Sequence, residues 1–475
     1  MMPVRQIETP VRASNPPAPR VFHAGSLVYT KAALLTLMAW LLWGDFVFNF
    51  MEIVIGSLLP LKIKGMDAPD WVIGIVLTTI PSFLGLVLGP VYAVTSDRTR
   101  TRFGRRIPYL VATTPLVTLL LLMIGFSDKL GQWLHGVLGL TSSPHLTLLM
   151  VTAILIAAFT LLNAFMTGAY YNLLNDVVPP EVLARFMAVF RIVGVIATAA
   201  FQFYLFGFAK SHMVELIVGS AVLYGVMFMA MSLVVKEGTY PPPTHRDVKS
   251  EGFWVSHIKS YIKECFCHRI YWYFFIASLF WNMSFVVYSF RVFFAQSAGL
   301  DLGTYGKLMG VSGIVSAVLL YPAGALGDRW HPMRTMILGM TLLAVAVPCQ
   351  LVFAFFTLPP AWEPGIYMGL FVLHISVQTV VRASEMPLQM RLLPQDRYAQ
   401  LCSAAGIIIS LGIMAAGAIS GLWLEWMKAR ETVELYHYRY LPAWSALCIL
   451  ISLGFFLLLY REWKRLGGDQ HYTAP

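Results

Sequence analysis

The sequence is poor in charged residues. Asp, Glu, Lys and Arg make up 12% of its 475 residues, whereas hydrophobic residues make up 58%, and the mean hydropathy is +0.68. Soluble domains usually carry about 25% charged residues. A chain of this length cannot bury so much apolar surface in a core of its own, so lipid must form a large part of its surroundings.

Cysteine is also scarce, and its spacing argues against two kinds of site. The five cysteines suggest no disulfide framework. Cys265 and Cys267 stand in a C-x-C-H segment without a second pair of ligands, so we expect free thiols and no metal. The H-E-x-x-H, G-x-S-x-G and G-x-x-x-x-G-K-S/T patterns of common enzymes are missing. We therefore expect a protein that is not an enzyme and has no cofactor.

Long apolar runs take up most of the chain. An α-helix needs about 20 apolar residues to cross a bilayer. We predict an all-α membrane protein with twelve transmembrane helices, at approximately 32–58, 71–95, 107–126, 146–174, 186–209, 214–235, 270–295, 304–326, 334–357, 365–390, 398–424 and 440–460.

The positive charge lies mainly in alternate segments between these runs. With the N-terminus inside, most of the 34 Lys and Arg fall in inner segments, which predicts that both termini are cytoplasmic. The net charge of +10 therefore indicates membrane topology, and we expect no nucleic-acid partner. A bacterial inner membrane suits this pattern, and we expect a monomer.

The longest inner segment divides the chain into two halves of six spans. The halves echo each other: Ser96-Asp97-Arg98 answers Gly327-Asp328-Arg329, which indicates a duplicated fold. We predict two pseudo-symmetric six-helix bundles. The expected parts are a disordered cytoplasmic tail (1–31), an N-terminal bundle (32–235), a cytoplasmic linker (236–269), a C-terminal bundle (270–460) and a second cytoplasmic tail (461–475).

The loop after the second span carries a specific motif. Residues 96–108 read SDRTRTRFGRRIP. This segment resembles the loop between helices 2 and 3 of the glycoside–pentoside–hexuronide cation symporters and the related sucrose transporters, a branch of the major facilitator transporters. The resemblance implies a carrier that moves a sugar or glycoside across the bilayer by alternating access.

The same loops offer a candidate gate. Asp can accept backbone N–H groups at a helix end, and Arg can pair with carboxylates at the membrane face. Such contacts can latch one conformation of a two-bundle carrier, although they can also serve only to set topology. The candidate gating residues are Asp97, Arg98, Gly104, Arg105, Asp328 and Arg329.

Polar residues inside the spans are the candidate solute site. Asp45, Asn49 and Glu52 share one face of the first span, because seven residues make nearly two helical turns. A charge within a span is costly and indicates a functional site. Gly44-Asp45-Phe46 resembles the segment of melibiose-type carriers in which an Asp binds sugar hydroxyls, and Arg191 falls where those carriers have a sugar-binding Arg. A structural ion pair between these two residues is the alternative.

The resemblance breaks down at the coupling site. Gly85 and Gly89 stand where melibiose-type carriers have two sodium-binding Asp residues, and the acidic residue of helix 4 is missing. Asn163 is a nearby polar residue of that span and a further candidate to bind the solute. Proton coupling would then fall to Asp45, Glu52 or Glu385. A uniporter, a sensor, or a carrier of a drug, lipid or organic ion remains the alternative.

The second half adds further candidates. Arg382 and Glu385 are three residues apart and can form either a coupling site or a structural pair. Trp281 could stack on a sugar ring while Asn282 donates a hydrogen bond, although packing is as common a role for Trp. We expect Arg291 to extend toward the membrane interface.

Overall fold

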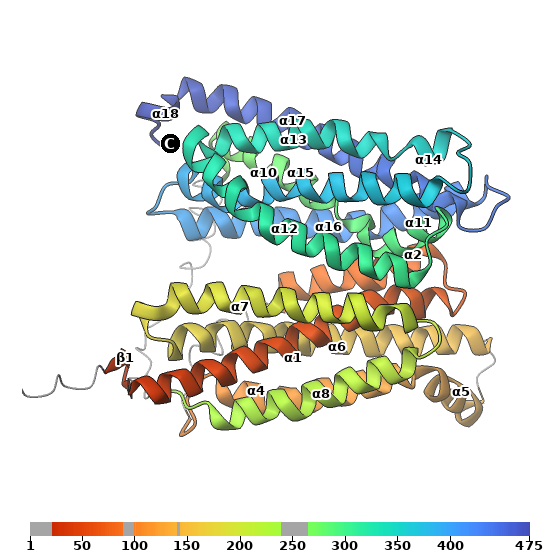
Figure 1. Cartoon of the computed structure of the whole chain (residues 1–475), viewed down its shortest axis with the longest axis horizontal. Helices are drawn as coiled ribbons and strands as arrows, with labels where there is room; N and C mark the ends of the chain where they lie inside the picture. Colours follow the sequence, from red (N-terminus) through yellow and green to blue (C-terminus); the bar gives the residue numbers. More distant parts are fainter. Residues whose placement is uncertain (1–20, 89–98, 100, 140–142, 239–264) are drawn as a thin grey trace, which may run out of the picture.

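A computed structural model of the chain describes residues 21–88, 99, 101–139, 143–238 and 265–475. Within these residues, twelve helices are long and apolar enough to cross a membrane. Figure 1 shows them in two layers, with the C-terminus and the first strand at the same end of the molecule. We call this end the terminal end and the other the loop end. The prediction of an all-α membrane fold with twelve spans is confirmed.

The first six spans form the layer that we call the N-bundle. Span 2 runs over Asp70–Leu88 and span 5 over Arg185–Phe208. The elements are α1 (Lys31–Lys64), α2 (Asp70–Gly74), η1 (Ile75–Thr79), α4 (Ile107–Gly125), α5 (Ser127–Leu138), α6 (Pro144–Val177), α7 (Pro180–Ala200), η2 (Phe201–Leu205), η3 (Phe206–Phe208) and α8 (Met213–Val234).

The last six spans form the C-bundle. Its span 7 is broken by the 3-10 turn η4. The elements are α10 (Arg269–Met283), η4 (Val286–Phe290), α11 (Arg291–Ser297), α12 (Leu302–Trp330), α13 (Pro332–Cys349), α14 (Val352–Phe355), α15 (Glu363–Leu392), α16 (Tyr398–Lys428), η5 (Tyr436–Tyr440), α17 (Leu441–Arg465) and α18 (Gly468–His471).

The two tails carry more structure than the sequence predicts. Within the predicted disordered segment 1–31, β1 (Phe22–Ala24) and β2 (Leu27–Tyr29) pair as an antiparallel hairpin, while residues 1–20 lie outside the described residues. The predicted tail 461–475 begins inside α17 and then folds back: the Tyr472 hydroxyl donates to the Leu392 carbonyl at 2.8 Å. Most of the predicted linker 236–269 lies outside the described residues.

The first span is longer than predicted, because two lysines are neutralised within it. Lys62 and Lys64 were expected in a loop, yet α1 continues through both. The Lys62 ammonium lies 2.9 Å from the carboxylate of Asp128, and that of Lys64 lies 2.7 Å from the carboxylate of Asp70. Each partner removes the penalty that an unpaired charge would impose on a buried helix end.

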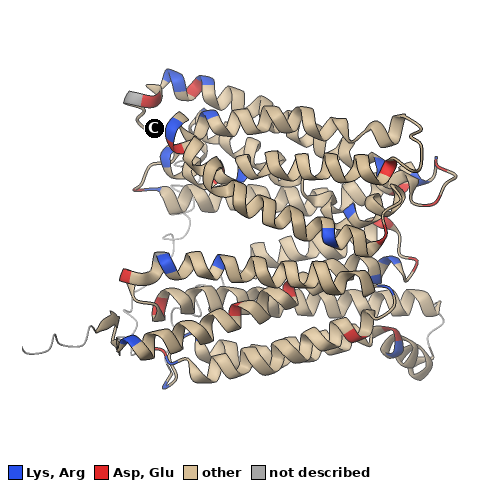
Figure 2. Ribbon diagram, viewed as in Figure 1, with Lys and Arg blue, Asp and Glu red and all other residues tan. Residues whose placement is uncertain are grey.

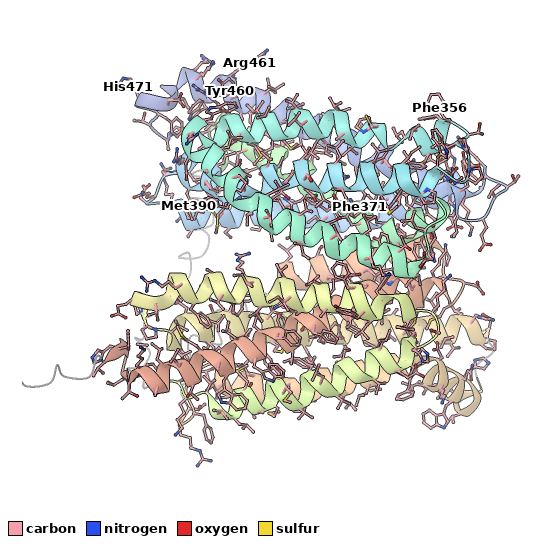
Figure 3. The ribbon with its side chains drawn as sticks, in the orientation of Figure 1. Phe356, Phe371, Met390, Tyr460, Arg461 and His471 are labelled. Atoms are coloured by element: carbon pink, nitrogen blue, oxygen red, sulfur yellow. The ribbon has the colours of Figure 1, made fainter. Side chains whose placement is uncertain are left out.

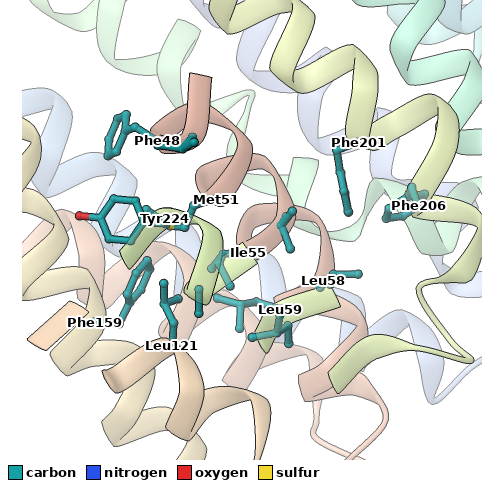
Figure 4. Close-up of a cluster of buried hydrophobic side chains, with 14 of the residues drawn as sticks. Phe48, Met51, Ile55, Leu58, Leu59, Leu121, Phe159, Phe201, Phe206 and Tyr224 are labelled. Atoms are coloured by element: carbon teal, nitrogen blue, oxygen red, sulfur yellow. The ribbon is translucent and has the colours of Figure 1, made fainter. Parts of the chain in front are cut away.

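Most charged residues lie at the two ends of the bundles, as the coloured ribbon of Figure 2 shows. Between them lie two hydrophobic clusters, one that extends from the N-bundle across the loop end into the C-bundle and one within the C-bundle. In the N-bundle, side chains of α1, α4, α6 and α8 interlock around Phe48, Met51, Ile55, Phe159 and Tyr224 (Figure 4). Figure 3 labels C-bundle residues along the length of the bundle. Phe356 lies near the loop end, Phe371 lies between the two ends, and Tyr460, Arg461 and His471 lie near the terminal end.

The two bundles meet near the loop end. There α16 packs on α2 and η1, and α12 packs on α7, η2 and η3. Glycines allow the close approach: a Cβ added at Gly74 would lie 2.0 Å from the Gly417 carbonyl oxygen, and one at Gly306 would lie 2.4 Å from the Gln202 carbonyl oxygen. Toward the terminal end the ribbons of α7 and α12 diverge (Figure 1). Among the described residues, the contacts between the bundles thus concentrate near the loop end.

Candidate functional site

A cavity of about 430 Å³ lies between the two bundles. The N-bundle lines most of it with α1, α6 and α7, and the C-bundle contributes α12. Small-molecule sites typically measure about 300–1,000 Å³. The lining residues are Asp45, Asn49, Tyr171, Met187, Phe190, Arg191, Gly194, Val195, Thr198, Ala199, Met309, Gly310 and Gly313. Three residues predicted for the solute site (Asp45, Asn49 and Arg191) are therefore brought together.

Asp45 is the acidic residue of this cavity. Its side chain is 0% exposed, and Oδ1 accepts a hydrogen bond from Asn49 Nδ2 at 2.7 Å. Asn49 is one turn further along α1, which places both side chains on one face. Oδ2 is buried and has no hydrogen-bond partner. A buried acceptor without a partner is costly, so Oδ2 is a candidate to accept a hydrogen bond from a bound solute.

The position of Asp45 is fixed by the packing of α1. Gly44 lies against Met231 of α8, and a Cβ at Gly44 would come within 2.9 Å of the Met231 Cε. Phe48 packs on the rings of Tyr170 and Phe228, with centroids 5.9 Å and 6.2 Å away. These contacts hold α1 against the other helices of its own bundle, so that Asp45 is presented from a rigid element.

Arg191 supplies the positive charge. It lies on α7 and is exposed to the cavity. In the described part of the chain, the ion pairs within 4 Å include neither Arg191 nor Asp45. The structural ion pair that was the alternative reading is therefore not formed in this conformation. Gly194 lies one turn further on and lets Asn49 approach α7, since a Cβ there would lie 3.3 Å from the Asn49 Cγ.

Aromatic side chains of the cavity were missed at the sequence level. Tyr171 and Phe190 both line it, with ring centroids 6.0 Å apart in an edge-to-face contact. Tyr171 follows directly on Tyr170, which is fully buried and donates to the Leu41 carbonyl at 2.8 Å. Two adjacent tyrosines in an apolar run give no sign of which one faces a cavity.

Polar groups continue from the cavity along α1 toward the loop end. Asn163 Nδ2 donates to the Glu52 carboxylate, and Gln202 Nε2 donates to the Ser57 hydroxyl at 3.1 Å. The remaining oxygens, Asn163 Oδ1 and Gln202 Oε1, are buried without a hydrogen-bond partner. Glu52 and Asn163 thus face each other as a pair, outside the residues that line the cavity.

Trp281 and Asn282 also lie outside the lining residues. Trp281 is 2% exposed and meets the edge of Phe285, with centroids 4.6 Å apart. Asn282 Nδ2 donates to the Ser278 carbonyl at 2.9 Å. In this conformation both side chains make contacts inside the C-bundle, and their role toward a solute stays a prediction.

Arg382 and Glu385 do not form an ion pair within 4 Å in the part of the chain that the structure describes. The Arg382 guanidinium lies 5.2 Å from the centroid of the Phe285 ring. Glu385 lies within the electrostatic influence of both the Trp281 indole and the Arg382 guanidinium. The role of Arg382 and Glu385 in coupling stays a prediction.

The C-bundle holds a buried polar network that was not predicted. Gln378 Nε2 donates to the Tyr288 hydroxyl at 2.8 Å. The imidazole of His374 joins Tyr288, 3.1 Å away, to Gln350, 2.8 Å away. The Arg291 guanidinium lies 3.5 Å from the centroid of the Tyr288 ring. The expectation that Arg291 reaches the membrane interface is therefore wrong, because its charge is stabilised over an aromatic face.

At the terminal end, the described part of the Arg-rich loop is held within the N-bundle. The Arg105 guanidinium donates to both carboxylate oxygens of Asp176, at 2.9 Å and 2.5 Å. The carboxylate of Glu237 accepts the backbone N–H of Arg106 at 2.7 Å, at the start of α4. Gly104 has φ of 108°, and a Cβ there would lie 2.3 Å from Glu237. Asp176 and Glu237 are contacts that the sequence analysis did not find.

The other predicted gating residues fall into two groups. Asp97 and Arg98 lie outside the described residues. Asp328 and Arg329, at the end of α12, are exposed. The gate proposed at the terminal end therefore remains a prediction, on an end where the two bundles diverge.

Two bundles joined at one end around a polar cavity define the class of membrane carriers that alternate between two openings. The family model of the Major Facilitator Superfamily matches residues 41–417. The chain belongs to this superfamily and is an integral membrane protein with its transporter fold. A comparison with curated proteins finds no match.

Solved structures with this fold include carriers of different solutes. A nucleoside transporter, NupG (D323A mutant), superposes with a TM-score of 0.65 and 13% identity, covering 89% of this chain and 100% of its own. A bacterial homologue of the human lysosomal transporter Spinster, in an inward-facing and occupied conformation, has a TM-score of 0.64 and 13% identity over 92% and 99%. A D-xylose–proton symporter has a TM-score of 0.64 and 12% identity over 90% and 97%. Identities this low support the fold and leave the solute open.

Proposed function

We propose that the chain is a secondary transporter of a sugar or glycoside. One observation carries this proposal. Asp45 and Arg191 line the same cavity, but they are not among the ion pairs within 4 Å in the described part of the chain. A carboxylate oxygen without a partner accepts hydrogen bonds from hydroxyls, and a guanidinium donates in a fixed fork. Together they can bind neighbouring hydroxyls of a polyol from two sides.

The rest of the cavity suits the same solute. Tyr171 and Phe190 offer ring faces on which the apolar side of a sugar can pack. Met309, Gly310 and Gly313 of α12 bring the C-bundle into the lining of the same cavity. A solute in this cavity touches both bundles, as alternating access requires.

Proton coupling is the second part of the proposal. Glu52 contacts Asn163 along the polar face of α1, and Glu385 contacts Trp281 in the C-bundle. Acidic residues within membrane spans commonly serve in proton relays, so either residue can carry a proton across the cycle. The carrier would lie in a bacterial inner membrane as a monomer, with both termini cytoplasmic and the terminal end open to the cytoplasm.

The proposal is tested by thermal stabilisation of the purified protein. A ligand that binds the folded state raises the melting temperature. We expect a shift with one class of mono-, di- or oligosaccharide or glycoside, retained without sodium and changed between pH 5.5 and 7.5. The shift should vanish in Asp45→Asn and persist in Asp128→Asn, whose ion pair with Lys62 lies far from the cavity. A saccharide shift that survives in Asp45→Asn would contradict the site.

Uptake into proteoliposomes then separates symport from uniport. With an imposed pH gradient, a proton symporter accumulates solute above equilibrium, and Glu52→Gln should abolish accumulation while leaving exchange across the membrane intact. Equal uptake with and without the gradient would favour a uniporter.

A non-sugar solute is the second candidate. Edge-to-face Tyr171 and Phe190 beside a carboxylate, an amide and a guanidinium also suit a nucleoside, whose base stacks while its ribose hydroxyls bond. Nucleosides therefore belong in the ligand panel. A shift with nucleosides and none with saccharides would favour this candidate.

A further inference from the structure

A cluster of polar side chains, centred on the buried Asp70, joins the two bundles at the loop end. The N-bundle contributes Lys64 and Asp70, and the C-bundle contributes Glu425, His437 and Tyr438. We call these five residues the loop-end latch. None of them lines the cavity around Asp45, and no motif in the sequence marks them.

Asp70 is the centre of the latch. It is 0% exposed. Oδ1 accepts from the Tyr438 hydroxyl at 2.6 Å and from the Lys64 ammonium at 2.7 Å, and Oδ2 lies 3.0 Å from His437 Nε2. The backbone N–H of Asp70, free at the start of span 2, donates to Glu425 Oε2 at 3.0 Å. Both oxygens and the backbone amide of one residue are therefore satisfied, three of these four contacts by the other bundle.

The charges in the latch are compensated within each bundle. Lys64 and Asp70 belong to the N-bundle and pair at 2.7 Å, and Glu425 pairs with Lys428 of its own helix at 3.3 Å. The contacts that cross between bundles come from a phenol, an imidazole and a backbone amide. Separation of the bundles breaks these hydrogen bonds but leaves each carboxylate beside a cation. The largest penalty of breaking a buried charge cluster, an uncompensated charge, is thereby avoided.

Water can take over the broken hydrogen bonds. A second cavity, of about 840 Å³, lies at the loop end and is lined by residues of both bundles, including Lys64, Lys428 and His437. Groups that separate beside this cavity can be hydrated directly. Gly421 of α16 lies next to the same contacts, since a Cβ there would lie 2.6 Å from the Asp70 carbonyl oxygen, and Gly74 and Gly417 continue this close approach of α2 and α16.

We infer that Asp70 is the shared acceptor of a reversible latch, whose strength sets how much of the protein is closed at the loop end. The inference does not depend on which solute is carried. A carrier that opens alternately at its two ends must break the cross-bundle contacts of Asp70 in every cycle. Weakening them shifts the population toward the conformation that is open at the loop end.

The test is a distance measurement across the loop end. Nitroxide labels at Ser211 and Ala361, two exposed loop residues on different bundles, are introduced into the full chain after its five cysteines are replaced. Double electron–electron resonance then gives the ratio of separated to closed loop ends. In Asp70→Asn we expect this ratio to rise at least about tenfold, because the two cross-bundle contacts from His437 and Tyr438 depend on the carboxylate.

Two matched controls remove ion pairs at the same end within one bundle. Asp128→Asn breaks the pair with Lys62 in the N-bundle, and Glu363→Gln breaks the pair with Arg439 in the C-bundle. Neither should change the ratio by more than about twofold, because neither contact crosses between bundles. An equal opening in these controls would mean that any charge loss loosens the loop end and would overturn the latch.

Tyr438→Phe is a second variant, which distinguishes a weaker latch from a misfolded protein. It removes one hydroxyl and retains the ring that stacks on Phe293, with centroids 5.0 Å apart. We expect a smaller rise in the ratio, and no further rise when it is combined with Asp70→Asn, because both act through the same acceptor. A ratio unchanged from the wild type in both Asp70→Asn and Tyr438→Phe would overturn the inference.

Discussion

Two buried aspartates of the N-bundle differ in what surrounds their carboxylates. Asp45 and Asp70 are both 0% exposed. Asp70 has contacts on both oxygens, from Lys64, His437 and Tyr438. Asp45 has one contact, from Asn49, and its Oδ2 has no partner.

The difference separates a structural carboxylate from one that is free to bind. Burying an acidic group is costly, and protein partners normally repay that cost. At Asp70, protein partners contact both carboxylate oxygens, and the residue joins the bundles. At Asp45, protein partners contact only one carboxylate oxygen, beside a cavity that Arg191 also lines. Burial alone would have ranked the two residues equally, whereas the number of partners assigns them different roles.

The largest expected effect tests this assignment through transport. Asp45→Asn and Arg191→Gln should lower uptake into proteoliposomes at least about 100-fold, because each removes a charged hydrogen-bonding group from the solute. Asp70→Asn should lower uptake less, since it shifts a conformational population and leaves the site intact. Initial rates with the solute identified by thermal stabilisation provide the measurement. The assigned roles are wrong if Asp70→Asn lowers the uptake rate more than either of the other two variants.

For thermal stability we expect the opposite order, with a larger effect of Asp70→Asn than of Asp45→Asn. Removing one member of a buried ion pair destabilises a protein by about 3–5 kcal/mol, so Asp70→Asn should lower the melting temperature clearly. Asp45→Asn should leave it unchanged or raise it, because it replaces a partly satisfied carboxylate by a neutral amide that still reaches Asn49. Melting curves of both variants without solute decide this, with Asp128→Asn as the control for a half-exposed pair. Equal losses at Asp45 and Asp70 would remove the distinction.

The sequence predicted the layout of this molecule far better than its contacts. Twelve spans follow from hydropathy, because lipid forces each apolar run to form a helix with its own hydrogen bonds satisfied. The two bundles follow from the long inner segment and the repeated Asp-Arg loops. The ends of α1 were less predictable, since Lys62 and Lys64 look like loop residues until Asp128 and Asp70 are placed beside them.

The candidate site was predictable only where polarity is unusual. Asp45, Asn49 and Arg191 stand out because polar groups in spans are rare, and they share one cavity. Tyr171 and Asp70 did not stand out, the first because aromatic residues are common in spans and the second because it looks like a loop charge. Contacts between residues 367 and 368 positions apart, such as Asp70 with His437 and Tyr438, cannot be read from local pattern.

The glycine contacts beside Asp70 offer a way to test the closed end without changing its charge. Gly74→Ala places a methyl group against the Gly417 carbonyl at a separation no real contact shows, so the helices must move apart. Overpacking of this kind costs about 1–3 kcal/mol. We expect faster labelling of a cysteine introduced at Gly65, which lines the loop-end cavity. Gly406→Ala, where an added Cβ meets nothing within 4 Å, should not change the labelling rate, and an equal increase there would argue against a packed closed end.

The smallest expected effect concerns the contribution of the Tyr171 hydroxyl to solute binding beside Asp45. The Tyr171 side chain is 44% exposed and lines the cavity, so its hydroxyl can hydrogen-bond a solute that Asp45 and Arg191 hold. Tyr171→Phe should raise the apparent KM by about five-fold with little change in maximal rate, the size expected for one neutral hydrogen bond. Tyr204→Phe, at a side chain that is 76% exposed outside the cavity lining, should leave both parameters unchanged. If Tyr171→Phe instead leaves KM unaltered while Tyr171→Ala raises it, the ring contributes by packing alone, and the polar recognition rests on the α1 and α7 residues.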